Sequence, residues 1–276
     1  MPRLTFDQYG KTEVRLTQVL RNEGRHDLVE LSIEILFRGD FAASYTDADN
    51  SIVLPTDTIK NTVYVLARQH PIIEIEGFAR ELAVHFLSRV ARLQQIHIGI
   101  EQMPWARISD HGSAFVLNGK DRRVTKLVAT RDDERITSGV YGLEILKTAH
   151  SAFAGFAKDE WTTLAETNDR LLGTVLDADW MYRSGERDFN AEYTRIRSML
   201  LDTFANHASE SVQHTLYAMA DAVLAATDSL VEVHLIMPNR HRILVDLSRL
   251  GVDNPNQIFL PVDQPSGYIE ARVSRE

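Results

Sequence analysis

Alternating apolar and polar residues mark the first strands that the chain is expected to form. Between Asp27 and Phe37, apolar side chains such as Leu31 take every second position and polar side chains take most of the others. A period of two is typical of a strand with one buried face. Lys11–Leu20 is also extended, and Asn22-Glu23-Gly24-Arg25-His26 contains the Asn and Gly that a hairpin turn favours. The pattern predicts an opening β-hairpin.

Helical periodicity follows this hairpin. Apolar residues recur at helical spacing over Asp57–Gln69 and again over Ile75–Arg92. His70-Pro71 separates the two stretches, because proline disfavours helical geometry in the residue before it. Gln95–Trp105 and Arg123–Thr130 are then predicted to form a second hairpin.

The same order of elements begins again near Ser138. Leu143–Leu146 and Thr174–Tyr182 are predicted strands, and Leu230–Met237 alternates as a third. Between the second and third of these strands, two apolar stripes predict two helices. The first stripe is Ile196, Met199, Leu200 and Phe204, and the second is Val212, Leu216, Met219 and Val223.

Polar residues stand where several of these helices are predicted to begin. Asn190 and Ser211 are predicted N-caps, whose side chains would accept hydrogen bonds from the first free N–H groups. Thr56 or Asp57 is predicted to cap the helix that follows Pro55. Pro238-Asn239-Arg240-His241 is predicted to form a hairpin that closes the second repeat.

Two consecutive units of this kind predict an α+β fold with antiparallel sheets that carry helices on one face. The units are predicted to span residues 1–135 and 136–276. The uncovered sheet faces are mixed in character. Such sheets are able to close edge to edge with other subunits, which removes exposed strand edges, so the pattern permits an oligomer without requiring one.

Composition narrows the classes of function. The 276 residues are 44% hydrophobic, which is ample for a buried core, and the formal charge of −9 repels nucleic acid. No Lys/Arg-rich run offers a local exception. The chain contains no cysteine, which excludes disulfides, thiolate nucleophiles and cysteine-ligated metals and suits a reducing cytosol. A small molecule or a protein is therefore the expected partner.

Targeting signals are also missing from the sequence. No stretch approaches the roughly 20 consecutive apolar residues of a membrane span, and the first residues lack the apolar segment of a signal peptide. The last residues, Val273-Ser274-Arg275-Glu276, are not the peroxisomal Ser-Lys-Leu signal. We expect a cytoplasmic protein that does not enter membranes.

The long connection Phe153–Arg170 is the most promising segment for chemistry. It mixes aromatics, paired hydroxyls and both signs of charge. A loop of this length in a compact domain tends to be functional or disordered, and its aromatics argue against disorder. Thr162-Thr163 with Glu166 would alternatively be a capping box on a short helix.

The remaining candidates carry little weight singly. Lys11 would act as a base only if burial favoured its neutral form. His241 lacks a second histidine at metal-ligand spacing, and no carboxylate or cysteine completes a zinc set with His207 and His214. We predict no metal, and these patterns by themselves do not specify a reaction.

Three segments, in order and at suitable separations, resemble the urate oxidase family. They are Thr56–Tyr64, the stretch from Leu146-Lys147-Thr148 through Phe153, Gly155-Phe156 and Asp159 to Arg170, and Pro238–His241, joined by Tyr9-Gly10-Lys11 and Ser211-Val212-Gln213. The resemblance covers roughly residues 6–272. It implies the tunnelling fold, with two tandem ββααββ units per chain and a homotetramer around a tunnel.

The resemblance also implies how urate is held. Arg170 and Gln213 would grip the polar edge of urate, since a guanidinium fork matches a planar, anionic pattern of oxygen and nitrogen atoms. Phe153 would lie against the purine face. Leu164 and the backbone of Val212 would close the pocket.

By the same resemblance, Thr56 and Asp57 would reach the ligand from a neighbouring subunit. Lys11 and Thr56 would form a proton relay assisted by His241, and Asn239, with Thr56, would hold dioxygen and then water above the ring. The expected activity is oxidation of urate by dioxygen to 5-hydroxyisourate and hydrogen peroxide, in purine degradation and without a cofactor.

Two departures from the family pattern and two alternatives accompany this hypothesis. The chain is somewhat short for the family, and Arg240 and Ala149-His150 differ from the expected residues, which bears on loop conformation and stability. One alternative is a pterin- or purine-handling enzyme of the same fold, several of which need zinc or a cysteine nucleophile. The other is a catalytically silent structural or binding relative.

Overall fold

The alternating residues near the start of the chain form a long hairpin in the computed structural model, which describes residues 2–275. Its strands are β1 (Tyr9–Asn22) and β2 (Arg25–Gly39), paired antiparallel from Tyr9 opposite Phe37 to Asn22 opposite Arg25. Gly24 turns the chain with a φ of 70°, which glycine adopts without steric cost. The predicted hairpin is confirmed.

The chain divides into two compact units, each with many contacts among its own residues. Unit 1 is Met1–Gly139 with Met181–Glu192, and unit 2 is Val140–Trp180 with Tyr193–Glu276. The predicted boundary between residues 135 and 136 falls inside one strand, β7 (Glu134–Lys147), which begins in unit 1 and ends in unit 2.

Antiparallel strands order unit 1. The sheet runs β1-β2-β3-β6 and continues to β7, with β3 at Leu93–Gln102 and β6 at Arg122–Ala129. The predicted pairing of β3 with β6 is confirmed. Their long connection carries a separate small ribbon of β4 (Trp105–Arg107) and β5 (Phe115–Leu117).

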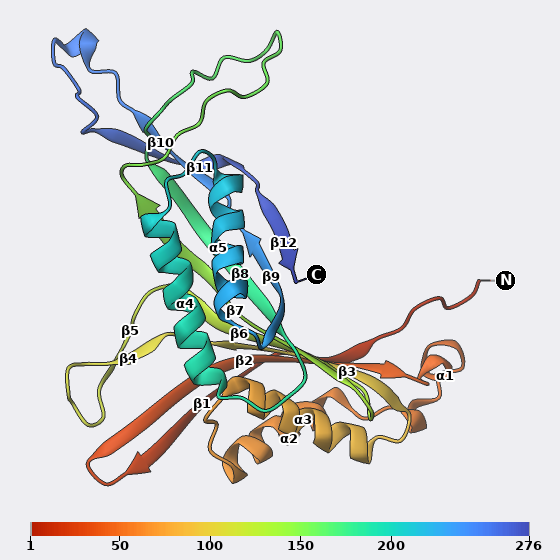
Figure 1. The fold of residues 1–276 in the computed structure, drawn as a ribbon. Coiled ribbons are helices and arrows are strands. Elements are labelled where there is room, and N and C mark those ends of the chain that lie inside the picture. Colours follow the sequence, from red (N-terminus) through yellow and green to blue (C-terminus); the bar gives the residue numbers. More distant parts are fainter. Residues whose placement is uncertain (1, 276) are drawn as a thin grey trace. The chain divides into compact units, whose positions relative to one another are not determined.

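Two helices cover one face of this sheet. The helix α2 (Thr56–Gln69) packs against β1, and α3 (Ile75–Arg89) packs against β3 and β6 (Figure 1). Their inward stripes are buried with the apolar face of β2, and each such side chain contributes about 1.5–3 kcal/mol when fully buried. Two short turns of helix, α1 (Ala42–Thr46) and η1 (Asn50–Ile52), lead into α2.

Helix capping in unit 1 differs from the prediction. Pro55 is the N-cap residue of α2, and no side chain caps that end, so neither Thr56 nor Asp57 acts as the cap. Thr56 is already the first helical residue, and the Asp57 carboxylate instead accepts hydrogen bonds from Lys60 and Asn61. The helix α3 ends at Arg89 rather than at Arg92, and the Arg131 guanidinium donates to carbonyls of the turn that follows.

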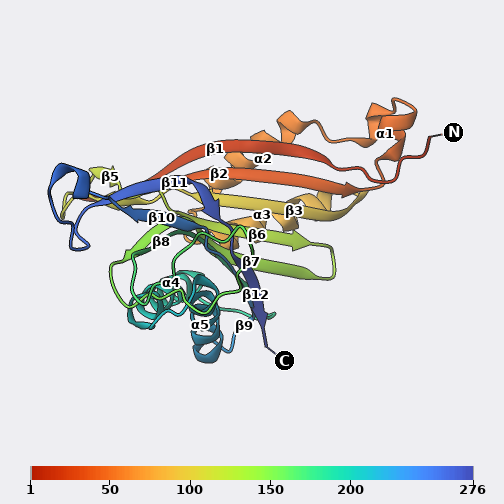
Figure 2. The same ribbon diagram turned by 90° about the horizontal axis from the view of Figure 1, so that it is seen from above.

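Unit 2 repeats the arrangement of strands and helices. Figure 2 shows α4 (Phe189–Asn206) and α5 (Val212–Ala226) together on one side of the unit 2 strands. The strand β8 (Leu172–Tyr182) lies beside β7, β9 and β10. The other strands and one short helix are β9 (Leu230–Ile236), β10 (Asn239–Leu244), η2 (Ser248–Leu250), β11 (Phe259–Gly267) and β12 (Glu270–Ser274).

The predicted hairpin at Pro238–His241 is wrong. Asn239 and Arg240 pair with Thr174 and Gly173 of β8, and β9 also pairs with β8. The chain therefore continues along the same neighbouring strand after Pro238, instead of turning back. On its other side β9 pairs antiparallel with β12, and β10 pairs antiparallel with β11.

One predicted N-cap in the second half of the chain is confirmed and one is wrong. Ser211 caps α5, and its hydroxyl accepts a hydrogen bond from His214 N at 3.1 Å. Asn190 lies within the first turn of α4, where Asp188 accepts from Ala191 N at 2.8 Å instead.

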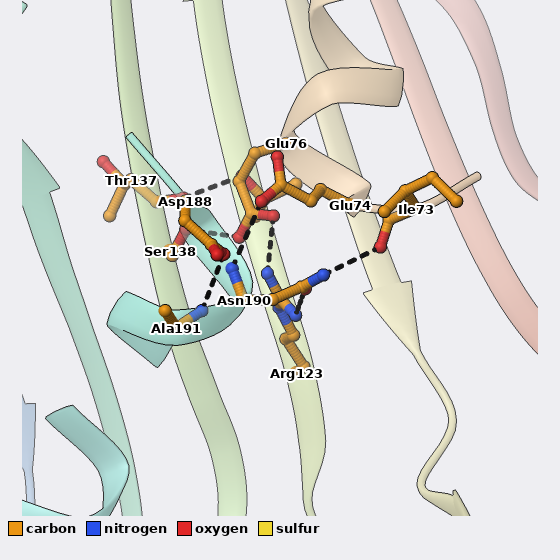
Figure 3. A network of polar contacts seen from close by, with 10 residues as sticks. Ile73, Glu74, Glu76, Arg123, Thr137, Ser138, Asp188, Asn190 and Ala191 are labelled. Atoms are coloured by element: carbon orange, nitrogen blue, oxygen red, sulfur yellow. Dashed lines mark hydrogen bonds and ion pairs between the residues drawn. The ribbon is translucent and has the colours of Figure 1, made fainter. Parts of the chain in front are cut away.

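The Asn190 side chain belongs to a buried polar network of unit 1 (Figure 3). Its amide oxygen accepts from Arg123 Nη1 at 2.5 Å, and its amide nitrogen donates to the Ile73 carbonyl at 3.0 Å. Arg123 Nη2 also donates to the Glu76 carboxylate at 2.7 Å, and Ser138 Oγ donates to the other oxygen at 2.5 Å. This network holds the start of α4 against α3 and β6.

Candidate active site

The long connection between β7 and β8 is ordered by its own backbone rather than by a helix. Phe153 and Thr167 pair in both directions, with N···O distances of 2.8 and 3.0 Å. Asp159 accepts from Trp161 N and Thr162 Oγ1 and so forms a tight turn. The alternative of a capping box at Thr162-Thr163 is wrong, since no helix forms in this loop and Glu166 pairs with Lys158 at 2.7 Å.

Arg170 and Phe153 come together at the base of this loop. Arg170 Cζ lies 5.2 Å from the centre of the Phe153 ring, and Phe156 stacks on that ring at 4.9 Å. The guanidinium is half-buried and has no ion-pair or hydrogen-bond partner among residues 2–275. Burial lowers the pKa of Arg170 below its usual value, although arginine keeps its charge in proteins. A partly desolvated cation without a counter-ion is a natural site for an anion.

Backbone hydrogen bonds tie this loop to the start of α5. Ser209 N donates to the His150 carbonyl at 3.0 Å, and Ala152 N donates to the Ser209 carbonyl at 2.6 Å. Arg170 N donates to the Ser151 carbonyl at 2.7 Å. Because Ser211 caps α5 two residues after Ser209, the loop and the first turn of α5 form one connected region.

Five predicted site residues line a single pocket of about 190 Å³ in unit 2. Its walls come from the long loop and from β10, whose first residue is Asn239. The predicted residues are Phe153, Leu164, Arg170, Asn239 and His241, and the walls also include Ala165, Thr167, Leu171, Arg242 and Ile243.

The other two predicted residues of unit 2 stand at the start of α5. Val212 is the first residue of that helix and is buried, and Gln213 follows it and is exposed. Neither lines the pocket of the isolated chain, but the pairing of Ser209 with the long loop keeps this helix end attached to Arg170.

Lys11, Thr56 and Asp57 belong to unit 1. Lys11 lies on β1 beside an irregularity in the pairing with β2, where Glu13 has a φ of 55°. The pKa of Asp57 is lowered, chiefly by the hydrogen bond from Lys60 and to a smaller extent by the charge of Lys11. Thr56 is exposed, and its hydroxyl makes no hydrogen bond to any other residue that the structure describes. Lys11 and Asp57 are thus close enough for their charges to interact, and Thr56 is next to Asp57 in the chain.

Arg242 is the pocket residue of most chemical interest that the sequence reasoning missed. It contributes a second cation to the pocket, and its guanidinium lies 3.9 Å from the Glu144 carboxylate. A single arginine on a short strand carries no recognisable motif. Only the pairing of β10 with β8 brings it beside the loop that holds Arg170.

Two negative findings apply to residues 2–275. No group of three or more histidine, aspartate or glutamate side chains gathers closely enough to hold a metal ion. Among the helices of that same range, none has the length and apolar character that crossing a membrane would require.

Comparison with known proteins places the chain in a family. The sequence profile of the family described as "Uricase" matches residues 7–128 and 136–270. The chain belongs to the uricase family. Uricase from Arthrobacter globiformis is 41% identical over 270 residues, which cover 98% of this chain and 89% of that relative. Uricase from Aspergillus flavus is 35% identical over 288 residues, covering 97% and 95%.

A solved uricase confirms the fold class. The crystal structure of the Arthrobacter globiformis uricase matches this chain with a TM-score of 0.97 at 40% identity, and the match covers 100% of this chain and 96% of that one. The predicted family resemblance and the α+β tunnelling fold are thus both confirmed.

Proposed function

We propose that the chain oxidises urate with dioxygen and water to 5-hydroxyisourate and hydrogen peroxide. Membership of the uricase family shows that the chain is an oxidoreductase of the urate oxidase kind. The main structural support for oxidation of urate at this pocket is the half-buried Arg170, which faces a small pocket beside Phe153 without a described counter-ion.

Substrate binding follows from the chemistry of this pocket. Urate is a planar anion, and the Arg170 fork presents parallel N–H donors to such a group. Gln213 adds an amide that both donates and accepts, from the adjoining end of α5. An aromatic stack on Phe153 contributes about 0.5–1.5 kcal/mol beyond area burial. Leu164 and the Val212 backbone limit access of water to the ring.

Activation of urate requires removal of a proton. In our proposal a neutral Lys11 takes that proton through the Thr56 hydroxyl, and His241 assists the relay. The hydroxyl of Thr56 is not used for capping or for any other described hydrogen bond, which leaves it available for this role. Asn239, at the pocket wall, holds dioxygen and then water above the ring.

The proposed reaction balances without a cofactor. The deprotonated purine gives two electrons to dioxygen, which takes up two protons and becomes hydrogen peroxide. Water then adds its hydroxyl to C5 of the oxidised ring and releases a proton. The electrons come from the activated substrate, so this scheme needs neither metal nor flavin.

Assembly is part of the proposal. We expect a homotetramer of two-unit chains, divided near residues 135 and 136, in which Lys11, Thr56 and Asp57 of one subunit complete the unit 2 pocket of another. The charge of Lys11 helps to lower the pKa of Asp57, which supports their contribution to the same site. A monomer would then be inactive. The absence of cysteine suits the reducing cytosol in which we expect the enzyme to work.

The experiment is to follow urate absorbance and hydrogen peroxide together, with purified, metal-stripped protein in air and under nitrogen. Loss of urate with an equal amount of peroxide, only in air, supports the proposal. Activity that appears only after zinc is restored would favour the pterin- or purine-handling alternative. Urate binding by a folded tetramer without any turnover would identify a silent relative.

A further inference from the structure

Lys147 is a buried cation that the proposed chemistry does not use. It is the last residue of β7, and only 9% of its surface is exposed. Its Nζ donates to the His207 carbonyl at 2.6 Å and to the Phe204 carbonyl at 3.4 Å. Burial lowers the pKa of Lys147, while the nearby charge of Asp169 opposes that shift.

The carbonyls that Lys147 binds are at the C-terminal end of α4. The last carbonyls of a helix have no partner within the helix, and the partial negative charge at that end favours a cation. A lysine from a neighbouring strand therefore fixes where this helix ends and how the chain leaves it. The chain that leaves is residues 207–211, which we call the α4–α5 connection.

Arg170 and Gln213, the two polar residues proposed to bind urate, are the arms of what we call the urate clamp, and the α4–α5 connection is linked to the first of them. Ser209 exchanges backbone hydrogen bonds with His150 and Ala152. The intervening Ser151 carbonyl accepts from Arg170 N at 2.7 Å. The Arg170 backbone is thus linked to the α4–α5 connection through residues 150–152, which form hydrogen bonds with both.

The same connection determines where the other arm begins. Ser209 Oγ donates to the Ser211 carbonyl at 3.0 Å, and Ser211 caps α5. Gln213 is the second residue of that helix. Both polar arms therefore depend on a segment of five residues, and a shift of that segment would change the spacing between them.

We propose that Lys147 is a positioning residue for urate, which sets the spacing of Arg170 and Gln213 by anchoring the α4–α5 connection to β7. This inference rests on the proposed function. Lys147 does not line the pocket, so it acts through the two residues that would contact the substrate. The described hydrogen bonds of Lys147 go to the Phe204 and His207 carbonyls and to no residue of the proposed proton relay, so we expect Lys147 to affect urate binding more than turnover.

A matched control exists in unit 1. Arg131 holds the end of α3 in the same manner, with its guanidinium donating to the carbonyls of Val90, Ala91 and Leu93. The segment it anchors contains none of the proposed site residues. Arg131→Met therefore removes a helix-end cation from the same protein without touching the clamp.

The test compares Lys147→Met, Lys147→Gln and Lys147→Arg with Arg131→Met, using tetrameric fractions of each. Steady-state urate oxidation gives KM and kcat, and calorimetry under nitrogen gives the Kd of urate without turnover. If the clamp loses one charge-assisted hydrogen bond, KM and Kd rise about tenfold or more. We expect that rise for Lys147→Met, a smaller one for Lys147→Gln, partial recovery in Lys147→Arg, and kcat within about threefold throughout.

Several outcomes would overturn the inference. One is a KM and Kd within twofold of wild type for all Lys147 variants, and another is an equal rise in Arg131→Met. If Lys147→Met does not fold, the glutamine and arginine variants decide by the same criterion. Failure of the proposed function is separate, because it would appear in the wild-type protein, which would then not consume urate whether or not it binds it.

Discussion

The buried pair of Glu76 and Arg123 allows a stability prediction in which two neighbouring arginines serve as test and control. Glu76 is completely buried, and Arg123 is 12% exposed. Arg123→Met leaves the Glu76 carboxylate with the Ser138 hydroxyl, at 2.5 Å, as its remaining described side-chain partner. Asn190 loses the donor to its amide oxygen as well.

Removing one partner of a buried ion pair costs about 3–5 kcal/mol, because the other charge stays in the interior without compensation. For a unit of this size, roughly 2–4 °C of melting temperature corresponds to each kcal/mol. The expected fall is therefore roughly 6–20 °C. Glu76→Gln combined with Arg123→Met should recover part of that loss, since the buried group is then neutral.

The control is Arg122→Met on the same strand. Arg122 pairs with Glu101 at 3.1 Å, and both side chains are 42% exposed. An exposed pair contributes about 0–1 kcal/mol, so this variant should melt within a few degrees of wild type. The assay is calorimetric melting at one protein concentration, because the proposed assembly would make the apparent stability depend on concentration. Equal losses for Arg122→Met and Arg123→Met would refute the reasoning.

Three further predictions concern the site and its supports. Arg170→Ala should raise the Kd of urate at least about tenfold, because charge-assisted hydrogen bonds contribute about 1.5–3 kcal/mol each; unchanged affinity in calorimetry under nitrogen would remove Arg170 from the clamp. Lys11→Met should bind urate normally yet turn over much more slowly, and a wild-type rate of urate loss would exclude Lys11 from the relay. Ser211→Ala should lower stability by about 1 kcal/mol, because His214 N loses its cap, and a melting curve identical to wild type would contradict that role.

Local pattern was sufficient for the elements whose determinants lie within them. The alternation at Asp27–Phe37 and the helical stripes at 57–69 and 212–223 depend on which face is buried, and the structure confirms all three. Ser211 was also predictable, because an N-cap hydroxyl satisfies an N–H only three residues away. The resemblance to the uricase family lies in contiguous motifs and was therefore visible in the sequence as well.

Tertiary structure decided the features that depend on distant partners. Asn190 is not a cap, because Arg123 and the Ile73 carbonyl occupy its side chain. Pro238 does not begin a hairpin, because β9 and β10 both pair with β8, a strand that is distant from them in the sequence.

The same limit applies to the candidate site. Sequence identified Arg170 by motif, but only the fold shows that its guanidinium is half-buried without a described counter-ion. Lys147 lies in a motif that resembles the family. Its hydrogen bonds at the end of α4, however, reach carbonyls 57 and 60 positions further along the chain. Hydrophobic periodicity indicates which face of an element is buried. The partner of a buried charge depends instead on how different elements pack together, and the sequence has no periodic pattern that indicates this.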